Sequence, residues 1–311
     1  MARALYAAAK NGAAMPCAID AGKFIVTYPR GAYTAARTVE QTKVFDYHGH
    51  IKRLVDSTMA MHPTTQFASA SDVERWLRPR TEATLVAAMK AFTDAHGTLP
   101  PQDEYKLTVL ICAPEEHNSD RDAETLLAAT DVYCHVGLLP PLRSELVKLL
   151  VAGMPRPNAH AKDTAWVRER KAIYDAMPAD VEEIVLMDPA THELLEGSQT
   201  NFYAVRDGAI YTAEDGILKG TVRSLVLDVC KARGIPVKLT PPRLDDVDSW
   251  EGCFISSTSR LVLGAKSLDF VDPATQQKVT RTFPSSPLVE QLTQWVRASV
   301  IDKSTQVFPS Q

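Results

Sequence analysis

The pattern of hydrophobic and polar positions changes from a period of two to a helical period within the first 61 residues. The runs FIVTY and AYTAARTV alternate or are β-branched, so the stretch from Lys23 to Tyr47 predicts a strand, a turn and a second strand. From His50 to Met61 the apolar residues recur at helical spacing, which predicts a helix directly after this hairpin. A second helix is expected from Thr81, as its N-cap, to His96, because Gly97 is a typical stop signal.

Two strand-like segments follow, at residues 105–113 and 131–139, and a polar stretch that begins EEHNSDRD joins them. The next segment, PPLRSE, contains two prolines that interrupt regular structure, so we expect it to connect two domains. A chain of 311 residues also exceeds the size at which a single hydrophobic core usually stops growing. The sequence therefore predicts a smaller N-terminal α+β domain at residues 1–138, a linker at 139–145 and a C-terminal α+β domain at 146–311.

The second half of the chain again mixes strand and helix patterns. The segments VKLLVAG and EEIVLMD predict strands, and TAWVRERKAIYDAM between them predicts a helix. In NFYAVRDGAIYTA, the pair Asp207-Gly208 lies between two alternating runs and predicts a hairpin with a type I′ turn. Residues 221–233 predict an amphipathic helix, and GCFISSTSRLVLG predicts a strand that ends in a turn rich in serine and threonine. The expected fold is α+β, with mostly antiparallel or mixed sheets and flanking helices.

Composition and charge exclude several classes of function. The chain has 34 basic and 38 acidic residues and no dense basic block, so nucleic acid is not an expected partner and a small-molecule substrate is. No apolar run approaches membrane-spanning length, so we expect no membrane association. The five scattered cysteines predict reduced thiols in a cytoplasmic compartment and no bound metal. The first 23 residues have too short an apolar stretch for a secretory signal, although a weak organellar leader stays open.

Three segments have residue types that suit a phosphate group. The helix that opens with Gly220, Thr221 and Val222 presents backbone amides without intrahelical partners at its positive end. The run of four hydroxyl residues at 256–259 can hold phosphate oxygens or only cap a turn. Arg53, one helical turn after His50, can clamp a phosphate with its guanidinium or simply be a solvated helix residue.

Glu196 and Lys162 are the other two candidates for chemistry. Glu196 is flanked by apolar residues and Gly197, and a buried carboxylate needs a partner such as a protonated pyridine nitrogen. The alternative is a glutamate in a surface turn. Lys162, in NAHAKDTAW, has polar neighbours, and nothing local marks it as reactive.

Taken in chain order, these segments resemble the class IV (fold type IV) aminotransferases. That family depends on pyridoxal 5'-phosphate and includes branched-chain aminotransferases, D-amino acid aminotransferases and aminodeoxychorismate lyases. The resemblance spans about residues 25–265 and rests on seven ordered motifs: GAYTAARTV, HIKRL, AHAKD, EEIVLMD, LLEGSQTNFYAVRDGAIYT, ILKGTVR and FISSTS. It implies a two-domain fold like that of D-amino acid aminotransferase.

The resemblance also implies a role for individual residues. Lys162, which stands 34 residues before Glu196 as in the family pattern, would bind the cofactor as a Schiff base and transfer the proton. Glu196 would pair with the pyridine nitrogen. The remaining cofactor contacts would come from Arg53, Asn201, Gly220, Thr221, Val222, Ser257 and Thr258. Tyr33 and Arg156 are implied as substrate residues, with the phenolic oxygen of the cofactor as the other partner for Arg156.

The function implied by the resemblance is a transaminase, acting as a homodimer, that exchanges an amino group between an amino acid and a 2-oxo acid. Two departures leave the substrate open. The segment after Lys162, DTAWVRERK, lacks the asparagine-tyrosine pairing of branched-chain members, and residues 105–130 lack the arginine and histidine pattern of D-amino acid enzymes. A lyase of the aminodeoxychorismate type and a catalytically silent binding protein remain as alternatives.

Overall fold

The structure is a computed structural model that describes residues 5–114 and 122–309, and the chain divides into two compact units. Unit 1 comprises Met1–Pro141, Ala161–Glu169 and Lys303–Gln311, and unit 2 comprises Leu142–His160 and Arg170–Asp302. Each unit contains one sheet with helices packed on it, which confirms the predicted α+β class. Of the predicted polar stretch EEHNSDRD, residues 115–121 lie outside the described residues.

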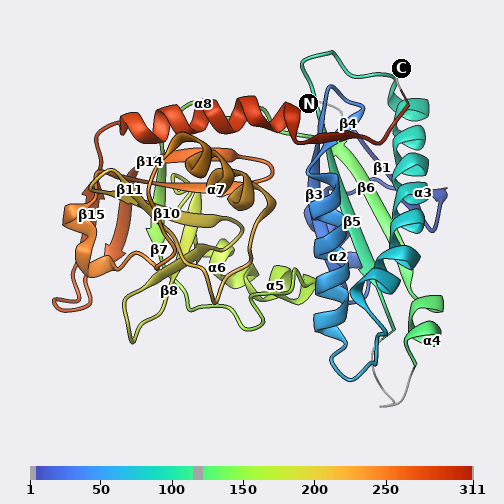
Figure 1. Ribbon diagram of the computed structural model, residues 1–311, viewed down its shortest axis with the longest axis horizontal. Helices are drawn as coiled ribbons and strands as arrows, with labels where there is room; N and C mark the ends of the chain where they lie inside the picture. The colour runs from blue at the N-terminus through green and yellow to red at the C-terminus, as the bar shows by residue number, and fades with distance from the viewer. Residues whose placement is uncertain (1–4, 115–121, 310–311) are drawn as a thin grey trace. The chain divides into compact units, whose positions relative to one another are not determined.

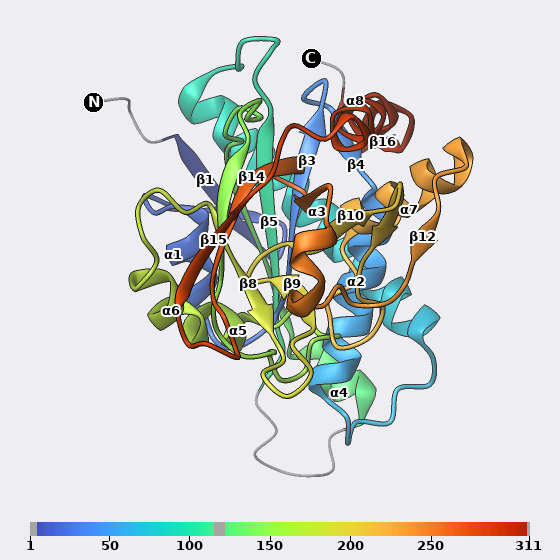
Figure 2. The same cartoon turned by 90° about the vertical axis from the view of Figure 1, so that its left-hand side faces the viewer.

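Within the described residues, unit 1 has a seven-stranded sheet in which each strand pairs antiparallel with its neighbours, in the order β16-β4-β3-β5-β6-β1-β2. Helices α2 and α3 pack on one face of this sheet, and α1 packs on the other (Figure 2). The strands and helices are β1 (Tyr6–Lys10), β2 (Ala13–Met15), α1 (Ala21–Thr27), β3 (Ala32–Val39), β4 (Lys43–Phe45), α2 (Tyr47–Met61), α3 (Ala70–His96), β5 (Tyr105–Cys112), α4 (Ala123–Ala128), β6 (Asp131–Leu138), α5 (Thr164–Glu169) and β16 (Ser304–Gln306).

The first predicted strand is wrong, because residues 21–27 form helix α1. Asp20 caps this helix by accepting a hydrogen bond from the Lys23 amide at 3.0 Å. Phe24 and Ile25 then point together into the core beneath the sheet, where Phe24 is 1% exposed. The run of β-branched residues at 25–27 is typical of a strand, so the sequence pattern alone favours a strand over this helix.

Helix α3 begins at Ala70, and its N-cap Ser69 lies twelve residues before the predicted cap, Thr81. Ser69 is its N-cap, and its hydroxyl accepts a hydrogen bond from the Asp72 amide at 3.1 Å. A proline usually marks a helix boundary, so the sequence pattern places the start of this helix after Pro79. In the structure Pro79 lies inside the helix. The predicted end is confirmed, since Gly97 has a φ of 77° and donates its amide to the Thr93 carbonyl.

The segment that contains Lys162 belongs to unit 1, which corrects the prediction that all residues after 146 form the second domain. The Tyr33 amide donates to the Lys162 carbonyl at 2.9 Å, and the Thr164 amide donates to the Gly31 carbonyl at 3.0 Å. These bonds add residues 162–164 to one edge of β3, where Asp163 pairs with Ala32. Strand β4 pairs with the other end of β3, at Thr38 and Val39. A local pattern cannot predict this long-range pairing.

Within the described residues, unit 2 has a nine-stranded mixed sheet in the order β12-β11-β10-β13-β14-β7-β8-β9, with β15 paired to β14. One additional pair, Asn201 with Glu196, joins β10 to β9 and closes six of these strands into a ring. Helices α7 and α8 pack against each other beside this sheet (Figures 1 and 2). The elements are β7 (Val147–Val151), α6 (Lys171–Asp175), β8 (Glu183–Met187), β9 (Leu194–Gly197), β10 (Asn201–Arg206), β11 (Ala209–Tyr211), α7 (Thr221–Arg233), β12 (Val237–Lys238), the 3-10 helix η1 (Leu244–Ser249), β13 (Gly252–Ser257), β14 (Leu261–Val271), β15 (Lys278–Thr282) and α8 (Pro287–Asp302).

Two local predictions in unit 2 are confirmed. The hairpin of β10 and β11 turns at Asp207 and Gly208, whose φ angles of 52° and 66° suit a type I′ turn. Helix α7 has the predicted bounds, and Gly234 ends it in the left-handed conformation. The helix predicted at TAWVRERKAIYDAM is instead two short helices, α5 and α6, which belong to different units.

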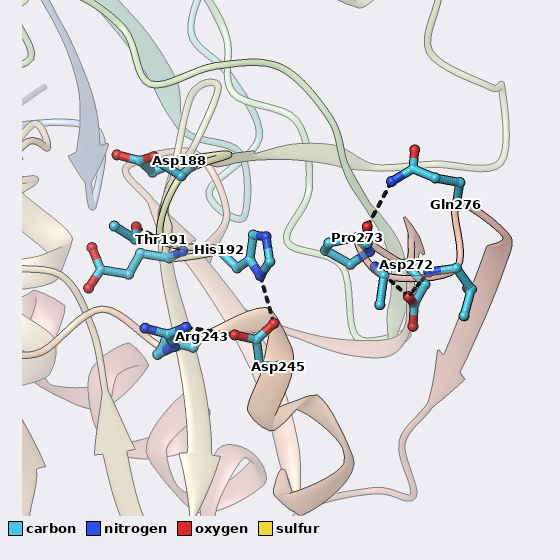
Figure 3. A network of polar contacts seen from close by, with 12 residues as sticks. Asp188, Thr191, His192, Arg243, Asp245, Asp272, Pro273 and Gln276 are labelled. Atoms are coloured by element: carbon cyan, nitrogen blue, oxygen red, sulfur yellow. Dashed lines mark hydrogen bonds and ion pairs between the residues drawn. The ribbon is translucent and has the colours of Figure 1, made fainter.

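An exposed polar network fastens the connection between β8 and β9 to helix η1 (Figure 3). His192 Nδ1 lies 2.8 Å from Asp245 Oδ1, and Arg243 donates to Asp245 Oδ2 at 2.7 Å. The Leu244 amide donates to the His192 carbonyl, so backbone bonds support the same contact. Among the residues that the structure describes, no helix combines the length and the apolar character needed to cross a bilayer.

Candidate active site

Lys162 lies against one face of helix α2 in unit 1. Residues 50, 53 and 57 of this helix share a face because they are spaced by one and two helical turns. The Lys162 amide donates to Ser57 Oγ at 3.0 Å, which fixes the backbone of the lysine. Its side-chain Nζ lies 4.9 Å from the ring centroid of Tyr33, and Tyr33 is 5% exposed. The structure therefore brings together the predicted residues Lys162 and Tyr33 beside the helix that contains Arg53.

His50 is a buried neutral base beside these residues. Its Nδ1 lies 2.7 Å from Thr34 Oγ1, and the residue is 2% exposed. Burial lowers the pKa of His50 well below its ordinary value of 6.5, and the positive charges of Arg53 and Lys162 lower it further. The sequence motif HIKRL contains this histidine, but the sequence itself predicts no role for His50 or Ser57. The one signal for them is that residues 50, 53 and 57 share a face of the helix.

Glu196 lies at the end of β9 in unit 2, where it is 4% exposed. Arg156 donates from Nε to Glu196 Oε1 at 2.7 Å, and the Leu218 amide donates to Oε2 at 2.9 Å. A guanidinium at this distance favours the ionised carboxylate. The predicted buried carboxylate therefore exists, with a cation and a backbone amide as partners.

Arg156, predicted to contact a substrate carboxylate or the phenolic oxygen of the cofactor, contacts Glu196 in unit 2. Its guanidinium also donates to the Ala159 carbonyl at 2.5 Å, and its side chain is 5% exposed. These contacts orient the arginine toward Glu196. Its contact with a substrate or with the cofactor stays a prediction.

Asn201 fixes the segment that precedes helix α7. Its Nδ2 donates to the Leu218 carbonyl at 2.7 Å, and its Oδ1 accepts from the Gly220 amide at 3.2 Å. A Cβ at position 220 would lie 2.4 Å from Asn201 Oδ1, so any larger residue there would displace the Asn201 side chain. Leu218 thus connects the predicted residues Glu196 and Asn201 through its amide and its carbonyl.

The amino-terminal end of α7 meets the turn after β13. Thr221 Oγ1 lies 3.5 Å from Thr258 Oγ1, and the first turn of α7 contains no acidic residue. The amides of this turn have no acceptor within the helix, and the helix dipole is positive there, so an anion is favoured. Val222, in the same turn, is 1% exposed. Ser257 differs from Thr258, because its hydroxyl accepts from the Arg260 amide at 3.3 Å inside the turn.

The loop that precedes helix α7 is held to the first turn of this helix by a salt bridge. Arg223 is 3% exposed and donates to the Ala213 carbonyl at 2.8 Å and to Glu214 Oε2 at 2.6 Å. Hydrogen bonds from Lys219 and then from Arg223 lower the pKa of Glu214. Residues 213–223 are therefore held as a closed loop that positions the amides of α7.

Comparison with known proteins identifies the family. The profile described as "Amino-transferase class IV" matches residues 31–268, which is more than half of the chain and spans both groups of candidate residues. The chain belongs to the class IV aminotransferase family. The resemblance found in the sequence motifs is thereby confirmed.

The class IV relatives include two kinds of aminotransferase. A probable branched-chain-amino-acid aminotransferase of Rickettsia felis is 25% identical over 152 residues, which cover 42% of this chain and 52% of that protein. A D-alanine aminotransferase of Listeria monocytogenes is 34% identical over 84 residues, covering 26% of this chain and 29% of that protein. The chain spans about half the length of the first curated relatives it matches.

Solved structures of aminotransferases have the same fold. The branched-chain aminotransferase from Thermoproteus uzoniensis superposes with a TM-score of 0.69 at 17% identity, covering 97% of this chain and 99% of that chain. A hypothetical aminotransferase from Mycobacterium tuberculosis, in its PLP-bound form, gives a TM-score of 0.69 at 16% identity, covering 95% and 99%. The predicted fold of the class IV aminotransferases is therefore confirmed.

Proposed function

We propose that this chain is a pyridoxal 5'-phosphate-dependent transaminase that exchanges an amino group between an amino acid and a 2-oxo acid. Membership of the class IV family supports the proposal. So do the structures of fold relatives, one in a PLP-bound form and one with pyridoxamine 5'-phosphate. The proposal rests chiefly on the buried carboxylate of Glu196, which pairs with Arg156. This pair lies in the same unit as the amino-terminal end of α7, which favours an anion.

The residues present suit the three polar groups of this cofactor. The phosphate would be held in unit 2 by the first amides of α7 and the hydroxyls of Thr221 and Thr258. The family resemblance implies Arg53 as a further phosphate residue. The ring nitrogen would be held by Glu196, whose carboxylate is buried and hydrogen-bonded to Arg156. Lys162 would supply the amine that bonds to the aldehyde. Asn201 and Gly220 would shape the cradle, because a side chain at position 220 would displace the Asn201 amide.

The chain's own residues then account for the proton transfers of transamination. When bound, the cofactor supplies a ring that accepts electrons from the substrate α-carbon. Glu196 would hold the protonated ring nitrogen, and the hydrogen bond from Arg156 would keep its carboxylate oriented. Lys162 Nζ removes the α-proton as a general base and returns it as a general acid. Tyr33 lies under Nζ, where its ring limits the directions in which the amine can reach.

A panel of L- and D-amino acids tests the proposal. Each donor is added to the purified, cofactor-loaded protein, and the visible absorption band is followed before and after a 2-oxo acid is supplied. We expect the band to disappear with at least one donor and to return with the 2-oxo acid. Pyruvate release from aminodeoxychorismate without amino exchange would indicate a lyase, and a protein that takes up no cofactor would indicate a silent binding protein.

The proposal includes a homodimer, since the resemblance to the family implies one. Size-exclusion chromatography with light scattering measures the mass directly. We expect twice the mass of the 34.2 kDa chain. A single-chain mass for the active protein would remove the dimer from the proposal and leave the chemistry in place.

A further inference from the structure

Two consecutive acidic residues, Glu182 and Glu183 of the motif EEIVLMD, have no role in the proposed chemistry. Glu183 is 0% exposed although it is a carboxylate at the start of strand β8. Its Oε1 accepts from the Ile184 amide at 2.9 Å and from Ser198 Oγ at 2.8 Å, and its Oε2 accepts from the Gln199 amide at 3.3 Å. A buried carboxylate that accepts two hydrogen bonds from one turn fixes that turn, because leaving either donor unpaired is costly.

The turn in question comprises residues 197–200 and lies between Glu196 and Asn201. The Gly197 amide donates to the Thr200 carbonyl at 2.8 Å, and the Ser198 amide donates to the Ile184 carbonyl at 2.8 Å. A Cβ on Gly197 would lie 3.0 Å from Glu183 Cγ and 2.0 Å from Thr200 Oγ1, so the backbone packs directly on the Glu183 side chain. The position of Glu183 therefore sets the path of the chain between two proposed cofactor residues.

The same acidic pair also reaches the turn that contains Thr258. Arg260 donates from Nε to Glu182 Oε1 at 2.7 Å, and its amide donates to Ser257 Oγ at 3.3 Å. Burial lowers the pKa of Arg260, but the charges of Glu183 and Glu182 outweigh this and raise it. The two glutamates thus neutralise a half-buried cation next to the proposed phosphate residue.

We propose that Glu183 is a positioning residue of the cofactor site: it holds the turn at residues 197–200 so that Glu196 and Asn201 face the cofactor. This inference rests on the proposed function. Both carboxylate oxygens are needed as acceptors, because an amide at this position would direct an NH₂ group at a donor of the turn. The inference assigns Glu183 an effect on cofactor binding and on the electronic state of the bound ring, beyond an effect on folding.

The experiment compares Glu183→Gln and Ser198→Ala with the wild-type protein, and uses Asp245→Asn as a matched control. Asp245 also accepts two side-chain hydrogen bonds in unit 2, but in the exposed network of Figure 3, where such pairs contribute little. For each protein we measure pyridoxal phosphate affinity by titration of the apo form, the pH dependence of the visible band, and the thermal unfolding temperature.

We expect Glu183→Gln to weaken pyridoxal phosphate binding about tenfold or more and to shift the pH midpoint of the visible band, since a hydrogen bond that holds the turn is lost. Ser198→Ala should weaken binding less, and Asp245→Asn should match the wild type. Wild-type affinity and pH midpoint in folded Glu183→Gln would overturn the inference while the proposed function stands. If Glu183→Gln does not fold, wild-type affinity and pH midpoint in Ser198→Ala would overturn it. A wild-type protein that takes up no pyridoxal phosphate would overturn the proposed function and the positioning role together.

Discussion

Arg156 Nε donates to Glu196 Oε1 at 2.7 Å, and both side chains are 5% exposed. This pair lies 40 residues apart in sequence and joins the loop after β7 to the end of β9. Removing one partner of a buried ion pair leaves an uncompensated charge in a medium of low polarity. The orientation of the carboxylate proposed to hold the ring nitrogen therefore depends on Arg156.

Replacing Arg156 by methionine should destabilise the protein strongly. Glu196 would stay buried without its cation, which costs about 3–5 kcal/mol in the free energy of unfolding. Denaturant unfolding of the apo proteins measures this difference. Arg206→Met is the control, since Arg206 pairs with Asp246 at the surface and should change the free energy by about 1 kcal/mol or less. Equal effects of the two substitutions would contradict the assigned role of the buried pair.

Replacing Glu196 by glutamine should reduce turnover while the cofactor remains bound. The amide cannot hold the ring nitrogen in its protonated form, and loss of one preorganised electrostatic contact lowers turnover by about 10²–10³-fold. The visible band should persist, because Lys162 is unchanged. Steady-state kinetics and the absorption spectrum check the two parts, with Glu193→Gln as a nearby carboxylate control. Full turnover by Glu196→Gln would remove Glu196 from the proposed site.

Adding one methyl group at Gly220 should disturb the end of helix α7. The new Cβ would lie 2.4 Å from Asn201 Oδ1, so the hydrogen bond between Asn201 and the Gly220 amide would break. We expect Gly220→Ala to weaken pyridoxal phosphate binding about tenfold, which corresponds to the loss of one hydrogen bond with a buried partner. Ser224→Ala, on the exposed side of the same helix, should bind as the wild type does. Unchanged affinity in Gly220→Ala would show that this cradle does not hold the phosphate.

The burial of His50 predicts a loss of stability in acid. Because folding depresses the pKa of His50 below 6.5, the unfolded chain takes up the proton first. Its contribution to stability is therefore present above pH 6.5 and is lost as the pH falls below that value, by up to about 1.4 kcal/mol per pH unit. Denaturant unfolding between pH 7 and pH 5 should show a smaller loss in His50→Gln. The pKa of buried His135 is also lowered, but His135 is present in both proteins, so identical slopes would contradict the prediction.

Elements with a strong local signal were predictable from the sequence. The turn at Asp207-Gly208 needs two residues that tolerate positive φ, and helix α7 has an apolar face between two glycines. Helix α1 is not predictable from its seven residues, because they contain a β-branched run that favours a strand. The Asp20 cap and the tertiary contacts stabilise the helix instead. Local propensity was overridden there by packing of Phe24 and Ile25 beneath the sheet.

The candidate residues were predictable from the ordered motifs, but their partners were not. The pairing of Lys162 with the edge of β3 and the contact of Arg156 with Glu196 join segments far apart in the chain. The pattern of a single sequence indicates which residues are buried and which type of element they form. It does not indicate which buried polar groups contact each other. The contact of Arg156 with Glu196 could not be predicted for that reason.

The most direct test of the proposed function is to find the lysine that bonds to the cofactor. The protein loaded with pyridoxal phosphate is reduced with borohydride, digested, and mapped by mass spectrometry, with Lys162→Ala and Lys171→Ala as the matched pair. We predict that the label lies on the peptide with Lys162, disappears in Lys162→Ala and remains in Lys171→Ala. A label on any other lysine, or a folded protein that binds the cofactor without labelling Lys162, would contradict the proposal.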